Sequence, residues 1–410
     1  MKMLPRLLAL GALAVLQACM TPPVTAPSTH AAPAGQRAPV TILVSIDGFR
    51  PDYLDRGDTP VLSRLAAEGA RGSMQPSFPT KTFPNHYAIA TGLHPDRNGI
   101  VGNRMEDPRR PGETFTMANV DPFWWDQAEP LWVTAEKADI RSATMFWPGS
   151  NAPVHGTYPS DWQQFAQALP EANRVQAIID WLRRPADTRP AFLTLYFDTV
   201  DTAGHRFGPD SPEVRAAMRG VDTRIGELMA GLATLGQPAN LIVTADHGMI
   251  AVDASRTIDL YSVVPQSAVQ VVEDGPYAAF NAVPGQEAQV RAAIARPAPH
   301  MQCWEKGKLP ERLAYGRNPR VPAFICIAES GWMILSRPPQ HPIRGGAHGY
   351  DNADPLMRAG LVAHGPAFRA GQTVDGRNVD VYALVRQLIG LPPASGVDGR
   401  IAPFATALRD

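Results

Sequence analysis

Six side chains of the kind that ligate metal ions stand in short motifs spread along the 410-residue sequence. Three are aspartates and three are histidines, a mixture of oxygen and nitrogen ligands that suits divalent metal ions. Two three-ligand sites can be built from them, and each would leave positions open for a substrate or a nucleophile. The six are Asp47, Asp201, His205, Asp246, His247 and His348, while His86, His94, His155 and His364 remain as ordinary histidines.

A hydroxyl nucleophile is available in the segment 79–87, which reads PTKTFPNHY. Thr82 directly precedes the Phe-Pro at which we expect a helix to begin, so we assign Thr82 rather than Thr80. A hydroxyl at a helix N-terminus gains from the positive end of the helix dipole, and metal coordination would lower its pKa. The alternative is that Thr82 only caps the helix.

The elements that must position these residues are three continuous apolar runs, 40–46, 191–197 and 241–245, each of which stops at an aspartate. Such runs are typical of strands buried on both faces of a parallel sheet. Helical patterns alternate with them, at 59–68 (with Thr59 as the expected N-cap), 171–183 and 213–235. We therefore predict an α/β fold with a doubly wound, mostly parallel sheet flanked by helices. Ligands bind such sheets at the carboxyl ends of the strands.

Two stretches interrupt the alternation, and we interpret both as insertions at the rim of a single catalytic domain spanning 40–410. The first, about 106–161, is rich in Trp and Pro. The second, about 257–344, has short β-like runs and is expected to form a small antiparallel subdomain. It contains Cys303 and Cys326, which could pair in an oxidising compartment or remain two separate buried thiols.

The first 39 residues are expected to direct export. Residues 1–19 have a basic start and then an apolar run of ten residues, 7–16, which is too short to span a bilayer and fits a signal peptide. The run ends in a sequence that resembles a lipobox, so Cys19 would carry a lipid anchor; the alternative is ordinary cleavage. Residues 20–39, rich in Pro, Ala and Thr, are expected to be a disordered tether. The protein would be periplasmic and tethered to the membrane.

Composition and charge exclude two broad classes of protein. A hydrophobic fraction of 44% allows a large core and excludes global disorder. Lys and Arg number 38 against 39 Asp and Glu, a net charge of −1, whereas proteins that coat nucleic acid usually carry a strong basic excess. We therefore expect no stable nucleic-acid partner.

Several motifs, taken together and in order over about residues 40–370, resemble the nucleotide pyrophosphatase/phosphodiesterase family of the alkaline phosphatase superfamily. They are DGFR from Asp47, PTKTFPNHY from Pro79, TGLHP from Thr91, NGI from Asn98, DTAGH from Asp201, DHGM from Asp246 and HGYDN from His348. The resemblance implies a two-zinc centre on a doubly wound α/β fold. One zinc would be held by Asp47, Asp246 and His247, with Thr82 also bound to it, and the other by Asp201, His205 and His348.

The resemblance also implies the residues around the substrate. Asn103 matches the family asparagine that hydrogen-bonds a phosphate oxygen. Phe83, Tyr196 and Phe165 match its substrate-facing aromatics, although all three could equally be core residues. Lys81 could help to neutralise the phosphate, or could simply be solvated.

The reaction implied is hydrolysis of nucleotide phosphodiesters or pyrophosphates to nucleoside 5′-monophosphates through a covalent intermediate on Thr82. The nucleobase would stack on Phe83 and Phe165. Other substrates remain open: lipid or choline-head-group diesters on the same centre, and the monoesters or phosphonates of the wider superfamily. A catalytically silent surface-binding lipoprotein is the alternative from a different class. Oxygen and nitrogen ligands would also accept manganese or cobalt.

Overall fold

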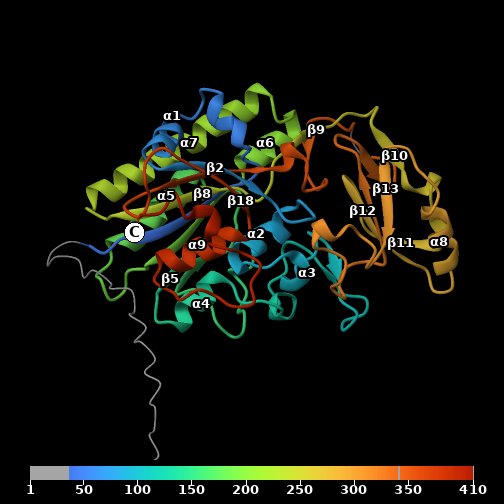
Figure 1. Cartoon of the computed structure of the whole chain (residues 1–410), viewed down its shortest axis with the longest axis horizontal. Helices are drawn as coiled ribbons and strands as arrows, with labels where there is room; N and C mark the ends of the chain where they lie inside the picture. The colour runs from blue at the N-terminus through green and yellow to red at the C-terminus, as the bar shows by residue number, and fades with distance from the viewer. Residues whose placement is uncertain (1–36, 340–341, 410) are drawn as a thin grey trace, which may run out of the picture. The chain divides into compact units, whose positions relative to one another are not determined.

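The centre of the fold is an eight-stranded sheet in the order β18-β2-β17-β8-β1-β7-β5-β6 (Figure 1). Its five strands from β8 to β6 run parallel, β17 is antiparallel to both β8 and β2, and β18 is parallel to β2. The strands are β1 (Val40–Ile46), β2 (Ala70–Gln75), β5 (Ser142–Met145), β6 (Asp161–Gln163), β7 (Phe192–Phe197), β8 (Ala239–Thr244), β17 (Ala359–His364) and β18 (Gln372–Arg377). The prediction of a mostly parallel sheet is confirmed.

This computed structural model describes residues 37–339 and 342–409. The predicted signal peptide, Cys19 and nearly all of the tether lie outside the described residues. From Arg37 onward the chain forms one compact unit. Within the described ranges, no helix combines the length and apolar character that crossing a membrane requires.

Helices cover both faces of the sheet (Figure 1). Helices α1, α5 and α6 pack against the long helix α7, while α2, α4 and α9 pack against one another. All residues of β1 and β7 are consequently buried, which explains why these strands are continuous apolar runs. The helices are α1 (Pro60–Glu68), α2 (Thr82–Thr91), α3 (Pro95–Asn98), α4 (Leu131–Lys137), α5 (Glu171–Arg183), α6 (Thr199–Phe207), α7 (Pro212–Thr234), α8 (Glu287–Ile294) and α9 (Asp380–Leu388).

Helix α1 begins as predicted, with Thr59 at the N-cap position, but the Thr59 side chain makes no capping hydrogen bond. The carboxylate of Asp222, on α7, instead accepts from the backbone N–H groups of Val61 and Leu62 at 3.0 and 2.8 Å. A helix far along the chain thus satisfies donors that a local cap would otherwise bind.

A second sheet of four antiparallel strands lies within residues 257–344, in the order β11-β12-β14-β13. Its strands are β11 (Val269–Glu273), β12 (Tyr277–Ala282), β13 (Met301–Glu305) and β14 (Phe324–Ala328). Helix α8 packs on it, and it has its own cluster of buried apolar side chains. We call this sheet with α8 the antiparallel subdomain.

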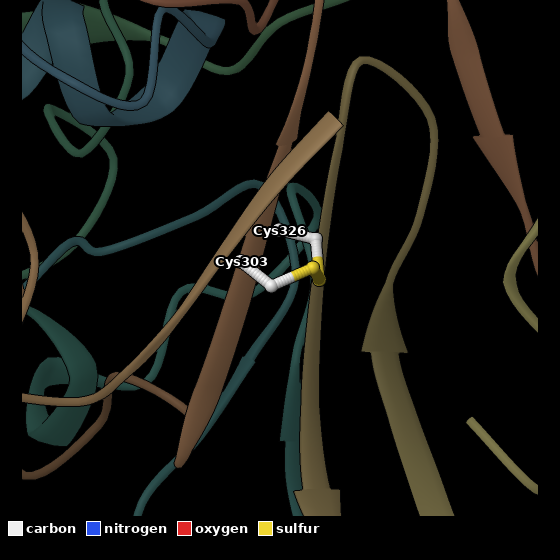
Figure 2. The surroundings of a disulfide bond; sticks show 2 residues. All are labelled: Cys303 and Cys326. Atoms are coloured by element: carbon white, nitrogen blue, oxygen red, sulfur yellow. A yellow bond between two sulfur atoms is a disulfide. The ribbon is translucent and has the colours of Figure 1, made fainter. Parts of the chain in front are cut away.

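Cys303 and Cys326 form a disulfide bond within the antiparallel subdomain (Figure 2). They stand directly opposite each other on β13 and β14, with their Cα atoms 4.0 Å apart. Of the two alternatives from the sequence, pairing is therefore the correct one.

The interpretation of 106–161 as an insertion at the rim needs correction. Strand β5, inside that range, is hydrogen-bonded to β7 in the central sheet, and α4 packs on β5. The strand is only four residues long and contains Ser142 and Thr144. Because it lacks a continuous apolar run, periodicity does not reveal it.

Short elements complete the described chain. Four two-residue strands and two three-residue strands pair as β3–β4, β9–β16 and β10–β15: β3 (Met105–Glu106), β4 (Thr114–Phe115), β9 (Ile250–Ala251), β16 (Gly346–Ala347), β10 (Thr257–Asp259) and β15 (Met333–Leu335). The 3-10 helices are Pro51–Asp55, Pro122–Trp125, Leu260–Ser262, Gln266–Ala268, Glu311–Leu313, Pro355–Met357 and Ala402–Phe404.

Candidate active site

Three neighbouring strands of the central sheet, β8, β1 and β7, deliver five of the six predicted ligands to one edge. Asp47 follows β1, and Asp246 and His247 follow β8. Nε2 of His247 lies 2.8 Å from Oδ2 of Asp246 and 3.5 Å from Oδ1 of Asp47. These three side chains form the buried cluster, whose ligand atoms lie within 4.8 Å of one another.

A second group, the open cluster, consists of Asp201, His205 and His348. The first two stand one turn apart on α6, which follows β7, with Asp201 Oδ2 and His205 Nε2 3.4 Å apart. His348 follows β16, and its Nε2 lies 3.1 Å from Nε2 of His205 and 3.7 Å from Oδ1 of Asp201. The two clusters adjoin, because the rings of His247 and His348 stack with centroids 3.5 Å apart.

The imidazoles are oriented through their Nδ1 atoms, each of which meets a backbone carbonyl oxygen. The partners are Gly346 O for His205 at 2.9 Å, Gly248 O for His247 at 3.0 Å and Thr80 O for His348 at 2.8 Å. A carbonyl oxygen only accepts, so each neutral ring carries its proton on Nδ1 and points the Nε2 lone pair into the cluster. This orientation is typical of metal-bound histidines.

The carboxylates of the two clusters have unpaired oxygens and repel one another, and a bound cation would relieve both conditions. One buried oxygen on each of Asp47, Asp201 and Asp246 has no hydrogen-bond partner. Burial raises the pKa of Asp47, and repulsion from Asp246 and Asp201 raises it further. Burial, followed by repulsion from Asp201, likewise raises the pKa of Asp246. The unpaired oxygens, the repulsion between the carboxylates and the converging Nε2 lone pairs together fit a divalent cation in each cluster.

Thr82 is the first residue of α2 and lies against the buried cluster. Its Oγ1 is 3.3 Å from Nε2 of His247. The hydroxyl of Thr80, by contrast, is buried, donates to Tyr350 O and accepts from the N–H of Gly349. Thr82 is thus the threonine whose hydroxyl faces the clusters, as predicted from its position before Phe-Pro.

Asn103 is held beside Thr82 by its amide oxygen, which accepts from the N–H of Phe83 at 3.0 Å. This bond leaves the Asn103 side-chain NH₂ as a donor. A donor beside the Thr82 hydroxyl is suited to an anionic oxygen.

A cavity of about 370 Å³ opens over the two clusters and Thr82. Predicted residues that line it are Asp47, Thr82, Phe83, Asn103, Phe165, Tyr196, Asp201, His205 and His348. The Tyr196 hydroxyl donates to Oδ2 of Asp47 at 2.6 Å, so this tyrosine orients a cluster carboxylate as well as forming a wall. Phe165 is 48% exposed and makes an edge contact with the Tyr196 ring.

Comparison with known proteins agrees with this geometry. The family model for type I phosphodiesterase/nucleotide pyrophosphatase matches residues 41–351. This chain belongs to that family. It is 37% identical over 366 residues to bis(5'-adenosyl)-triphosphatase enpp4 of Xenopus laevis, covering 88% of this chain and 79% of that protein. Family membership confirms the resemblance noted from the motifs and makes the protein a hydrolase.

Other members differ in length. Human ectonucleotide pyrophosphatase/phosphodiesterase family member 1 is 37% identical over 380 residues, which are 88% of this chain but only 41% of that protein. The solved structure of human ectonucleotide pyrophosphatase/phosphodiesterase 5 superposes with a TM-score of 0.85 at 31% identity, covering 90% of this chain and 100% of that one. A murine counterpart, an inactive threonine-to-alanine variant, was solved in complex with AMP and has the same TM-score at 32% identity, over 91% of this chain and 100% of its own.

Of the residues predicted to contact the substrate, Lys81 alone does not line the cavity. Its ammonium nitrogen lies 3.7 Å from Oε1 of Glu273 and 5.8 Å from the centre of the Tyr277 ring. Both partners belong to the antiparallel subdomain. The prediction overlooked them because they lie far away in the sequence.

Further residues line the cavity that were not predicted from the sequence. They are Met117, Phe146, Trp147, Pro148, Gly149, Asn151, Gln163, Gln167, Asp198 and Thr202. Asp198 is held by Arg174 and Gln167, at 2.7 and 3.1 Å. Because Asp198 follows the apolar run 191–197, it could have been predicted at the edge of the sheet. Most of the other residues lie in 106–161, the stretch that was interpreted as an insertion at the rim.

His86, predicted to be an ordinary histidine, contacts the backbone of Thr82. One ring nitrogen contacts the Ser45 hydroxyl at 2.8 Å and the other Thr82 O at 2.8 Å. Burial lowers the pKa of His86 to about 3, so the ring is neutral and donates a single hydrogen bond. The PNHY motif alone contains no signal for this role.

Proposed function

We propose that the protein is a metal-dependent enzyme that hydrolyses phosphodiester and pyrophosphate bonds of nucleotides and releases nucleoside 5′-monophosphates. The observation that carries the proposal is the position of the Thr82 hydroxyl. It lies at a helix N-terminus, against the buried cluster and at the wall of a cavity that is partly aromatic.

In the proposed reaction, Thr82 Oγ forms a bond to phosphorus while the bond to the leaving oxygen breaks. The threonine proton leaves with the departing alcohol or phosphate. Water then adds to the phosphothreonine, which restores the Thr82 hydroxyl and releases the nucleoside 5′-monophosphate. Divalent cations held by the two clusters would lower the hydroxyl pKa and offset charge on the phosphate and the leaving group.

The residues around Thr82 have distinct tasks in this proposal. The free NH₂ of Asn103 donates to a non-bridging phosphate oxygen, in a place where charge builds up during displacement. The N-terminus of α2 adds a positive dipole end. His86 and Tyr196 keep Thr82 and Asp47 in position, through the hydrogen bonds described above.

The aromatic side of the cavity supports nucleotides as substrates. Phe83 and Phe165 would stack on a nucleobase, an interaction worth about 1–3 kcal/mol per base in single-strand binders. The name of the amphibian relative, a bis(5'-adenosyl)-triphosphatase, and the AMP bound to the murine relative point to the same class.

A substrate panel tests the proposal. Initial rates would be compared on a dinucleoside polyphosphate, a nucleoside 5′-aryl diester, lysophosphatidylcholine and glycerophosphocholine. We expect the two nucleotides to be the preferred substrates by at least tenfold in kcat/KM. Preference for either choline ester would move the protein to the lipid or head-group phosphodiesterases.

We further propose that both cations are zinc. Each cluster combines aspartate oxygens with histidine nitrogens, which zinc accepts as ligands, and the family resemblance implies a two-zinc centre. Elemental analysis of the purified protein tests this. Two equivalents of zinc per chain are expected; manganese or cobalt in the same amount would contradict the zinc assignment but retain the two sites.

Export and tethering through a lipid on Cys19 are also proposed. The Cys303–Cys326 disulfide supports an oxidising compartment, because thiols of most cytosolic proteins stay reduced. Fractionation of cells that express the wild type and Cys19→Ala is the test. We expect the wild type in the membrane fraction and the variant in the soluble fraction; equal distribution would contradict the lipid anchor.

A further inference from the structure

The cationic residue nearest the nucleophile in sequence is already neutralised by a partner. Among the described residues, the cavity wall contains no lysine or arginine. Lys81, immediately before Thr82, forms an ion pair with Glu273 at 3.7 Å, and both side chains are almost nine-tenths buried. The positive charge beside Thr82 therefore has a counter-charge supplied by the antiparallel subdomain.

Glu273 is held firmly in this place. It is the last residue of β11, where an irregularity in the pairing with β12 shifts the register between Val271 and Glu273. Such irregularities redirect a side chain out of the regular pleat. The Tyr277 hydroxyl donates to Oε2 of Glu273 at 2.6 Å. A methyl group on Gly102, beside Asn103, would lie only 2.9 Å from the same oxygen.

Lys81 is confined between this carboxylate and the loop that carries His348. A Cβ atom at Gly349 would lie 2.7 Å from Cε and 3.3 Å from Nζ of Lys81. Gly349 also has a φ of +121°, which disfavours any other residue. The ammonium group is thus fixed next to a cluster ligand, with Glu273 as its counter-ion.

We propose that Glu273 determines specificity by cancelling the charge of Lys81, so that the site favours monoanionic phosphodiesters over dianionic phosphomonoesters. This inference rests on the proposed function. Glu273 is a positioning residue, since it acts through Lys81 and does not line the cavity. A free cation here would stabilise a dianion about twice as strongly as a monoanion, because Coulomb energy scales with charge.

The test is the ratio of kcat/KM for p-nitrophenyl phosphate to that for bis(p-nitrophenyl) phosphate. Glu273→Gln removes the charge but still offers Tyr277 an acceptor, so we expect the fold to persist and the ratio to rise roughly tenfold. The double variant Glu273→Gln, Lys81→Met should return to within about twofold of the wild-type ratio. Glu305→Gln, which removes a carboxylate that pairs with Arg291 and Lys308 in the same subdomain, is the matched control and should not change the ratio.

A binding readout separates this inference from the proposed function. The dissociation constant of AMP, which carries a dianionic phosphate near pH 8, should fall roughly tenfold in Glu273→Gln and recover in the double variant. Unchanged AMP binding with an unchanged ratio, or equal losses of rate on both esters, would make Glu273 merely structural. A wild type that does not hydrolyse the diester would contradict the proposed function, while the change in AMP affinity would still decide the effect of Glu273 on charge.

Discussion

The two ligand clusters contain the same kinds of residue but differ in exposure. In the buried cluster, the side chains of Asp47, Asp246 and His247 are at most 2% exposed. In the open cluster, His348 is also buried, at 5%, but Asp201 is 16% and His205 is 44% exposed. The difference follows from the supporting elements, because two adjacent inner strands end at the buried cluster whereas a helix and a loop form the open one.

This contrast suggests a division of labour across the cavity. The buried cluster lies against Thr82, the proposed nucleophile, and hydrogen bonds with His247 and His86 hold this residue in place. The open cluster includes the partly exposed His205, so we expect water to enter and the leaving group to depart on this side. Preorganisation of the reacting groups lowers the barrier to displacement at phosphorus.

The largest expected effect is at the buried cluster. Thr82→Ala should lower kcat by at least about a thousandfold, because it removes the proposed nucleophile, while Thr82→Ser should retain measurable turnover. Steady-state kinetics and mass spectrometry for a phosphorylated enzyme are the measurements. Thr80→Ala is the matched control: it should cost about 1–3 kcal/mol of stability, since Gly349 N–H loses its acceptor, yet it should keep its activity. An inactive Thr80→Ala beside an active Thr82→Ala would reverse the assignment.

The next effect concerns the open cluster. His205→Ala should reduce bound metal toward one equivalent and lower kcat/KM by at least about a hundredfold, because losing a ligand should cost at least as much as losing a group that only supports a ligand. Because His205 is nearly half exposed, the fold should persist. Elemental analysis is the measurement, and His364→Ala, whose histidine pairs with Glu68 instead, is the control. Full metal content in His205→Ala would remove this residue from the cluster.

A smaller effect is expected from His86, whose Nδ1 lies 3.5 Å from Oδ2 of Asp246 in the buried cluster. Its folded-state pKa of about 3 is below the ordinary value of 6.5, so the unfolded chain binds the extra proton first as the pH falls. Stability should therefore be complete above pH 6.5 and decline between 6.5 and about 3. Between pH 7 and 5 the loss should be about 2 kcal/mol. Guanidinium unfolding at the two pH values measures it, and His86→Gln should show a correspondingly weaker pH dependence; identical slopes would contradict the role of burial.

The smallest effect is expected at the exposed end of the cavity. Phe165→Ala should raise KM for a nucleoside 5′-diester by roughly fivefold to tenfold, because about 1–1.4 kcal/mol of stacking is lost. The same change should have little effect on bis(p-nitrophenyl) phosphate, which lacks a nucleobase. Phe207→Ala, which also removes an exposed phenylalanine, is the control. An equal rise in KM for both substrates would indicate that Phe165 lines the cavity without stacking on the nucleobase.

Much of the site could be predicted from the sequence, for a physical reason. Strands buried on both faces must be continuous apolar runs, so their ends are visible, and the polar residues there must share one edge of a parallel sheet. That logic brings together Asp47, Asp246 and Asp201. The motifs then identified His348 and Asn103, whose positions no periodicity would reveal.

Only the tertiary structure decided how distant residues pair. Asp222 caps α1, Glu273 neutralises Lys81, and Cys303 bonds to Cys326 because separate elements pack together. Strand β5 likewise becomes a strand through pairing with β7, since its four residues have no apolar pattern of their own. Local propensity and periodicity act over a few residues, whereas these contacts depend on packing between segments that the chain order does not place side by side. The sequence therefore determined which groups could perform the chemistry, and packing determined which of their charges remain unpaired.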